Sequence, residues 1–105
     1  MHEFIMVLTT FKDANQAALM ARVLVEKKLA ACCNILKDVH SVYMWEGELQ
    51  DQSEALMLIK TKSSLFHALE SEIKSLHSYA TPEIVVLPIV EGSDAYLHWV
   101  EQSTL

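Results

Sequence analysis

The sequence predicts an α+β fold in which helices cover one face of an antiparallel sheet, and three observations lead to this prediction. Segments with strand and helix periodicity alternate along the chain. Gly47, the one glycine in the middle of the chain, separates two segments with strand character. The 105 residues are 51% hydrophobic and 21% charged and contain no repeat, which fits a single domain over residues 1–105.

The first quarter of the chain predicts a strand followed by a helix. The apolar run Phe4–Thr10 is typical of a strand that is buried on both faces. Asp13 is a candidate N-cap, and Gln16 stands three residues later in the position of a capping box. The helix extends to about Lys28, with Lys27 and Lys28 in its last turn. Its apolar positions at helical spacing are Ala17, Ala21, Leu24 and Val25.

A long hairpin follows the first helix. From Cys33 to Trp45 the apolar residues recur with a period of two, and after the turn Glu46–Glu48 a second strand is predicted over Ala55–Thr61. At about 3.3 Å per residue, the roughly fourteen residues from Cys33 to the Gly47 turn span about 46 Å, whereas a domain of this size has a diameter of roughly 33 Å. The end of the hairpin is also apolar, with Val42, Tyr43, Met44 and Trp45.

We therefore expect the hairpin to pack on other copies of the same chain, because a soluble monomer does not display such a ribbon freely. The alternative is a bend at Lys37-Asp38 that folds the hairpin back over its own sheet.

The second half predicts a helix, a strand and a final helix. Ser63 or Ser64 is a candidate cap for a helix that ends near His77, with Leu65, Leu69, Ile73 and Leu76 as its apolar stripe. Pro88 places the strand Ile84–Val90 at a sheet edge or a bulge. After Gly92, Ser93 or Asp94 caps a short helix that contains Tyr96, Leu97, Trp99 and Val100. The order is that of a ferredoxin-like βαββαβ sandwich with one extra C-terminal helix.

Charge and cysteine content exclude several classes of function. Fourteen acidic and eight basic residues give a net charge of −6, which disfavours nucleic acid and anionic membranes as partners. No apolar run approaches the roughly 20 residues of a membrane span, and the N-terminus lacks the pattern of a signal peptide. Cys32 and Cys33 are neighbours, which predicts free thiols and a cytoplasmic protein. We expect no catalytic residues, because phosphate loops, serine elbows and two-histidine zinc motifs are missing.

Several separated motifs together resemble the CutA family of divalent-cation tolerance proteins. They are Leu29–Cys32, Ser41–Gly47, Ile59–Thr61, His77–Ile84, Leu87–Ile89 and Tyr96–Trp99. The resemblance implies a ferredoxin-like homotrimer whose long hairpins contact neighbouring subunits. It also implies a role in tolerance of copper and other divalent metals, kinship with PII-type signalling trimers, and no catalytic reaction.

The sequence departs from the family in the segment from which a metal role is inferred. The usual His-Pro-Tyr-Glu is here His77-Ser78-Tyr79-Ala80, so that a proline and a carboxylate are missing. The family's copper-site cysteine and first histidine correspond to Thr9 and Leu76, which leaves only His77. No cofactor is expected to be obligatory, and the candidate ligands for copper or another divalent metal are His77 and Cys32. Alternatively, His77 is a helix C-cap or an interface hydrogen-bonding group, and Cys32 is a core residue.

Lys60 lies in a strand segment that shares the resemblance and has two possible roles. It forms an interfacial ion pair, for instance with Glu83, or it binds a small anion in a cleft between subunits, as in a PII-like signalling module. Four aromatic residues are expected in that cleft or as apolar anchors of the interface: Tyr43, Trp45, Tyr79 and Trp99. The carboxylates Glu46, Glu48, Asp51 and Glu54 are expected to form a solvated hairpin tip that discourages aggregation.

Overall fold

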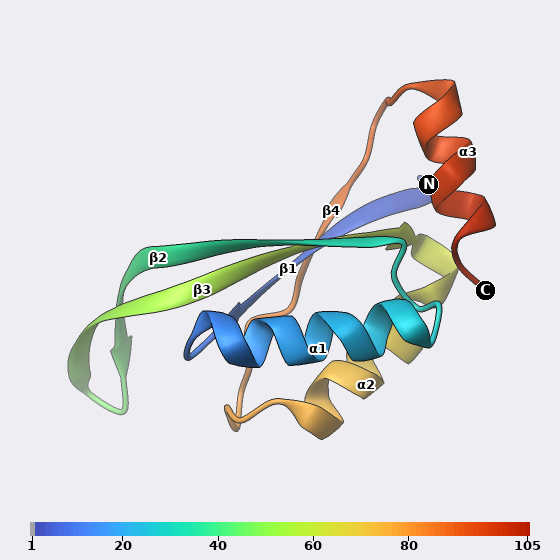
Figure 1. Ribbon diagram of the computed structural model, residues 1–105. Helices are drawn as coiled ribbons and strands as arrows, with labels where there is room; N and C mark the ends of the chain where they lie inside the picture. The colour runs from blue at the N-terminus through green and yellow to red at the C-terminus, as the bar shows by residue number, and fades with distance from the viewer. Residues whose placement is uncertain (1) are drawn as a thin grey trace.

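The computed structural model describes residues 2–105 and confirms the predicted ferredoxin-like order with an appended helix (Figure 1). Within these residues the sheet has four strands in the order β2-β3-β1-β4, and every neighbouring pair is antiparallel. The elements are β1 (Phe4–Phe11), α1 (Ala14–Glu26), β2 (Cys32–Trp45), β3 (Glu48–Lys62), the 3-10 helix η1 (Ser63–Leu65), α2 (Phe66–Leu76), β4 (Val85–Pro88) and α3 (Asp94–Gln102).

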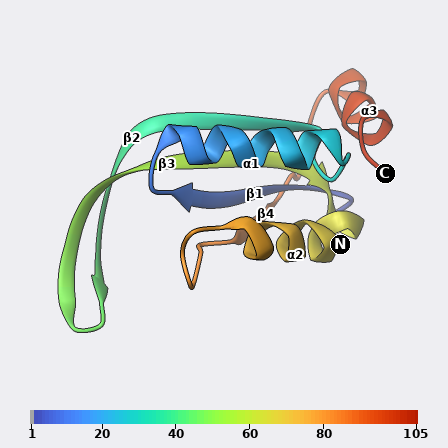
Figure 2. The ribbon, with the colours of Figure 1, turned by 60° about the horizontal axis from the view of Figure 1, so that its bottom comes forward.

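Both α1 and α2 lie on one face of the sheet and enclose the core (Figure 2). Val7 of β1 pairs with Ile59 of β3, and both side chains are fully buried against the helices. Leu24 of α1 and Ile73 of α2 are also fully buried. Burial of side chains of this size supplies about 1.5–3 kcal/mol each, so this layer is the main source of stability.

The ends of the helices agree with the sequence only in part. Asp13 caps α1, because its side chain accepts a hydrogen bond from the backbone N–H of Gln16. The Gln16 side chain, however, accepts a hydrogen bond from Ser78 instead of completing a capping box. The prediction that a serine side chain caps the second helix was wrong, since η1 precedes α2 and Ser63 donates to the carbonyl of His2. Ser93 does cap α3.

Two residues predicted for the apolar stripes point to solvent. Val25 is exposed, and Met20 takes the buried position between Ala17 and Leu24 on α1. In the same way Leu76 is exposed at the end of α2. Both residues lie in the last turn of their helices. Lys27 lies just after α1 and forms a 2.7 Å ion pair with Glu72 of α2.

The second strand of the hairpin is longer than predicted, and the hairpin bends at Lys37-Asp38, the place named in the alternative to the favoured prediction. The second strand, β3, begins at Glu48 and not at Ala55, and its register with β2 shifts between Leu36 and Val39. Asp38 adopts the left-handed conformation there, with φ of 57°. Beyond this bulge the hairpin curves away from the sheet and does not fold back flat over it (Figures 1 and 2).

The strand β4 is an edge strand, as Pro88 predicted, and it ends at Pro88. None of the helices in residues 2–105 has the length and apolar character needed to cross a membrane.

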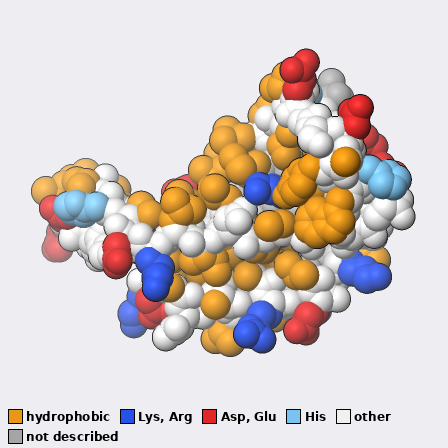
Figure 3. All heavy atoms as spheres, turned by 45° about the horizontal axis from the view of Figure 1, so that its top comes forward, with side chains coloured by type: hydrophobic (Ala, Val, Ile, Leu, Met, Phe, Trp, Pro, Cys, Tyr) orange, Lys and Arg blue, Asp and Glu red, His pale blue; other side chains and the backbone are white. Residues whose placement is uncertain are grey.

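The sheet face opposite the helices is apolar and uncovered, apart from α3 at one end. Because side chains alternate along a strand, residues paired with Met6 and Leu8 share this face. We call it the open face and define it by Met6, Leu8, Leu36, Leu56, Leu58, Val85 and Leu87. In Figure 3 hydrophobic side chains gather across the middle of this surface.

Candidate functional site

His77 is fixed at the end of α2 by both of its ring nitrogens. Its backbone N–H completes the helix by bonding to the carbonyl of Ile73. Nε2 lies 2.7 Å from the carbonyl oxygen of Thr10, and Nδ1 lies 3.0 Å from the backbone nitrogen of Tyr79. A carbonyl only accepts and a backbone N–H only donates, so Nε2 carries the proton and Nδ1 accepts. The ring also stacks on Phe11, with 4.6 Å between centroids.

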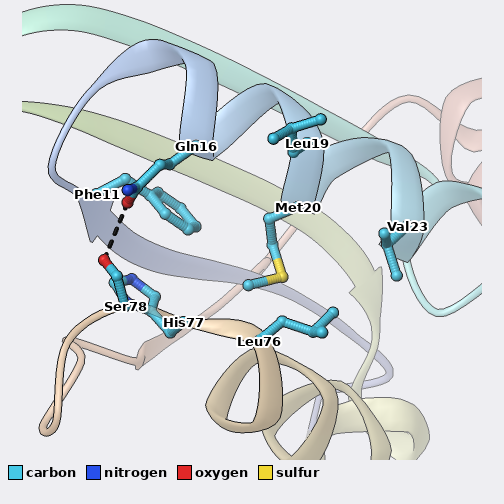
Figure 4. A pocket seen from close by; sticks show the side chains of 8 residues that line it. All are labelled: Phe11, Gln16, Leu19, Met20, Val23, Leu76, His77 and Ser78. Carbon is cyan, nitrogen blue, oxygen red and sulfur yellow. Dashed lines mark hydrogen bonds between the residues drawn. The ribbon is translucent and has the colours of Figure 1, made fainter.

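This arrangement determines how His77 can act. Both nitrogens have protein partners, so a metal ion could bind the ring only by displacing one of them. Figure 4 shows His77 and Ser78 facing Phe11 and Gln16, beside a small cavity of about 290 Å³ between the two helices. The predicted C-cap role of His77 is therefore present in the structure, and the imidazole also holds the start of the following loop in place.

The two residues predicted as metal ligands are not close together. Cys32 pairs with Lys60 at one end of β3, and its thiol lies 3.8 Å from the side-chain oxygen of Asn34. Thr10, whose carbonyl contacts His77, pairs with Leu56 of β3. Leu56 lies four residues from Lys60, which is about 13 Å along the strand. No group of three or more His, Cys, Asp or Glu side chains with metal-binding geometry is present in residues 2–105.

The second cysteine faces the opposite side of the sheet. Cys33 pairs with Ile59 and packs against the core, whereas Cys32 faces away from the helices. Burial raises the pKa of the Cys33 thiol to about 12, and the adjacent Cys32 adds to the rise. Since the thiolate is the form that binds metals, Cys33 is a poor ligand.

Tyr79 and Glu54 form a contact that joins the loop after α2 to the hairpin. The Tyr79 hydroxyl donates to Oε2 of Glu54 at 2.6 Å. Burial raises the pKa of this hydroxyl, and the hydrogen bond to Glu54 and its charge raise it further. Glu54 itself is only 6% exposed, so the expectation of a solvated carboxylate at the hairpin tip was wrong for this residue.

Replacing Tyr79 with phenylalanine is expected to destabilise the protein by about 1–3 kcal/mol near neutral pH, because Glu54 then loses its donor. The raised pKa of Tyr79 stabilises the folded state fully below the ordinary tyrosine pKa of about 10, and this stability is lost as pH rises above it. The difference between wild type and Tyr79→Phe should therefore narrow above about pH 10.

The measurement is urea denaturation of both proteins from pH 7 to 11 at one protein concentration. Tyr43→Phe is the control, because it removes a tyrosine hydroxyl of the hairpin and leaves the Tyr79 hydroxyl that donates to Glu54. A difference that stays constant or widens with pH would contradict the prediction.

A cavity of about 860 Å³ lies between the hairpin and the loop after α2, and we call it the hairpin cavity. Four of the residues predicted for a cleft line it: Tyr43, Trp45, Tyr79 and Glu83. The other lining residues are Thr10, Ser41, Val42, Glu46, Glu54, Ser78, Ala80, Thr81 and Pro82. Within residues 2–105 its walls contain carboxylates but no basic side chain.

Lys60 and Trp99 lie elsewhere in the chain. The Lys60 ammonium is 5.7 Å from the centroid of the Tyr96 ring, and Tyr96 packs beside Trp99 with 5.6 Å between centroids. This cluster belongs to α3 and the adjoining end of β3. Within a single chain, the six residues predicted for one cleft therefore lie in two separate places. The sequence missed Glu54 and Thr10 as site residues, because their partners are 25 and 67 positions away.

The chain is similar to proteins from many organisms. Residues 5–103 match the profile of a family described as CutA1 divalent ion tolerance protein. The divalent-cation tolerance protein CutA of Thermus thermophilus is 44% identical over 98 residues, which cover 93% of this chain and 95% of that protein. Protein CutA of Mus musculus is 47% identical over 95 residues, which cover 90% of this chain and 54% of the mouse protein. This chain thus spans about half the length of the mouse relative.

Solved structures have the same fold. The crystal structure of CutA1 from Oryza sativa superposes with a TM-score of 0.96 at 39% sequence identity, and the match covers 99% of this chain and 95% of that one. The structure of the Thermus thermophilus protein gives a TM-score of 0.93 at 42% identity, with 96% of this chain and 98% of that one covered. All but the first few and last few residues of the chain therefore have a counterpart in this family.

Proposed function

Because the chain belongs to the CutA1 divalent ion tolerance family, we propose that it acts in divalent-cation tolerance as a homotrimer that binds copper or another divalent metal weakly. The proposal assigns binding and no catalytic reaction. The observation that supports self-association most strongly is the apolar open face. Leu36, Val85 and Leu87 on it are each more than 40% exposed, and a soluble protein rarely leaves such a patch uncovered.

The hairpin supports the same proposal. The molecule measures 44 × 25 × 22 Å, and the curved hairpin accounts for its elongation (Figure 2). Its distal half leaves Val42 60%, Met44 62% and Leu49 67% exposed. Association through the open face and the hairpin would bury both apolar surfaces at once, and the family resemblance gives three as the number of subunits.

The metal would be held by His77, with Cys32 as the second candidate from the sequence. Since the imidazole must give up the carbonyl of Thr10 or the backbone of Tyr79, we expect weak binding by His77. Because the positions of Cys32 and Thr10 are about 13 Å apart along the strands, His77 and Cys32 act as separate sites unless a second subunit brings them together.

Calorimetric titration with Cu(II), Cu(I) and Zn(II) tests the metal site. His77→Gln, which keeps a side chain able to donate to the carbonyl of Thr10, is expected to abolish the binding at His77 and to leave any binding at Cys32. The matched control is His67→Gln, because the side chain of His67 is 95% exposed at the start of α2. Unchanged affinity in His77→Gln would eliminate His77 as a ligand.

The anion-binding alternative also needs a trimer. Lys60 would have to meet the hairpin cavity of a neighbouring subunit, since it lies beside Tyr96 and does not line the cavity of its own chain. Titration of the trimer with inorganic phosphate tests it, and Lys60→Met should then remove the response.

We also propose a cytoplasmic location, on the basis of two neighbouring free cysteines. Relatives are described with different locations, periplasmic in Archaeoglobus fulgidus and chloroplastic in Arabidopsis thaliana.

A further inference from the structure

The cavity between α1 and α2 lies in the layer of helices, and we call it the helix cavity (Figure 4). Its lining residues come from β1, from α1, and from the end of α2 with the two residues that follow. Within the described part of the chain, none of these lining residues belongs to the hairpin or to the open face. Both helices lie on the opposite side of the sheet from the open face (Figure 2). Self-association through the open face and the hairpin therefore leaves the helix cavity accessible.

Two polar contacts between the helices frame the cavity. At one end the hydroxyl of Ser78, just after α2, donates to Oε1 of Gln16 on α1 at 3.0 Å. At the other end the Lys27 ammonium lies 2.7 Å from Oε2 of Glu72. Val23 lines the cavity four residues before Lys27, so this ion pair stands about one helical turn beyond it. The contacts join α1 to the α2 side at both ends, as expected of a pre-formed site.

The floor and the rim of the cavity are apolar. Phe11 and Met20 at its floor are buried, whereas Leu19 and Leu76 at its rim are 67% and 52% exposed. A ligand that entered would cover the two leucines, whose exposure the proposed oligomer does not remove. Among residues 2–105 the walls include no Asp, Glu, Lys or Arg side chain, and burial of a charge without a partner is costly. An uncharged ligand is therefore favoured, and the Met20 thioether adds a preference for an aromatic ring.

One end of the cavity carries the groups that orient such a ligand. Because Oε1 of Gln16 accepts the Ser78 hydroxyl, the amide N–H groups of Gln16 can donate to a ligand and the Ser78 oxygen can accept from it. A hydroxyl group meets both needs, since it donates and accepts at once. The volume of about 290 Å³ lies at the small end of the range for ligand sites, and a cavity of about half that size holds a benzene ring.

We propose that the helix cavity binds a small uncharged phenol, with its ring between Met20 and Leu76 and its hydroxyl at Gln16 and Ser78. The proposal is independent of the metal site, because it uses neither ring nitrogen of His77, both of which keep their partners in the protein. It is also independent of the number of subunits, because every lining residue comes from one chain.

Titration of the intact protein with 4-methylphenol at neutral pH, followed by NMR of the methyl groups, tests this proposal. Light scattering records the oligomeric state of the same sample. We expect saturable shifts of the methyl signals of Leu19, Met20 and Leu76. Toluene, which lacks the hydroxyl, should bind about two- to tenfold more weakly than 4-methylphenol. The probe 4-methylcyclohexanol, which keeps the hydroxyl but has no aromatic ring, should also bind about two- to tenfold more weakly.

A pair of matched variants locates the site. Val23→Phe places an aromatic ring in the cavity and is expected to weaken the binding of 4-methylphenol about tenfold or more. The control is Val25→Phe, the same substitution at an exposed position of α1 outside the cavity, which should leave binding within about twofold. Ser78→Ala removes the acceptor and should weaken the binding of 4-methylphenol about two- to tenfold without changing that of toluene.

Equal binding of 4-methylphenol by Val23→Phe and Val25→Phe would overturn the proposal, as would equal affinity of the wild type for toluene and 4-methylphenol. Shifts of methyl signals at the open face with none in the helix cavity would overturn it in favour of a site on that face. Thermal unfolding of each variant shows whether it is folded. Since Ser78 is exposed, Ser78→Ala keeps the test decisive should Val23→Phe not fold.

Discussion

Replacing Leu58 with arginine is expected to lower the mass of the protein in solution from about 36 kDa, three chains of 11.9 kDa each, to that of one chain. Leu58 lies at the middle of the open face, paired with Leu8 on one side and Asn34 on the other. An arginine there would place a charge without a partner inside an apolar interface. Because this face is uncovered in the single chain, the side chain can still reach solvent after dissociation.

The measurement is size-exclusion chromatography with light scattering at micromolar concentration. Leu19→Arg is the matched control, because Leu19 is 67% exposed on α1 and far from the open face in the fold. That variant should keep the mass of the wild type. A wild-type mass near 12 kDa would contradict self-association itself, and an unchanged mass of Leu58→Arg would show that the open face is not the interface.

Local signals predicted the fold because they act over a few residues. The side chain of Asp13 caps the helix beside it, and Pro88 is compatible only with an edge or a bulge whatever the rest of the chain does. The alternation of apolar residues indicated the length of β2. Asp38 adopts the left-handed conformation at the bend that was considered only as an alternative. Errors occur in the last turns of the helices, at Val25 and Leu76, which keep helical spacing but are exposed.

The candidate site was harder to predict because it depends on contacts between distant segments. Glu54 belongs to a run of carboxylates near the hairpin turn, and nothing in that run distinguishes it from its exposed neighbours. It is nevertheless buried: it pairs with Val39, just beyond the bulge, and accepts a hydrogen bond from Tyr79 of the loop after α2. The side chain of Gln16 has the spacing of a capping box, yet Ser78 takes its oxygen. Similarly, sequence alone gave no distance between His77 and Cys32.

Replacing Phe11 with alanine is expected to destabilise the protein by about 3–5 kcal/mol, the usual cost of deleting a buried aromatic side chain. Phe11 is 1% exposed at the end of β1, and its ring is stacked on His77. Its loss should therefore also free the imidazole, weaken the hydrogen bond from Nε2 to the carbonyl of Thr10, and loosen the loop that holds Tyr79 on Glu54.

Denaturation at one protein concentration measures the first effect, and the NMR signals of the His77 ring measure the second. Phe66→Ala is the control, since Phe66 packs on the same core from the start of α2 and its ring contacts His67 instead. That variant should lose stability while the signals of His77 stay in place. A loss of less than about 1 kcal/mol in Phe11→Ala, or an unchanged His77 signal, would contradict this prediction. Both effects are expected because the Phe11 ring is part of the core and also stacks on the His77 imidazole. Stability and the position of His77 should therefore change together.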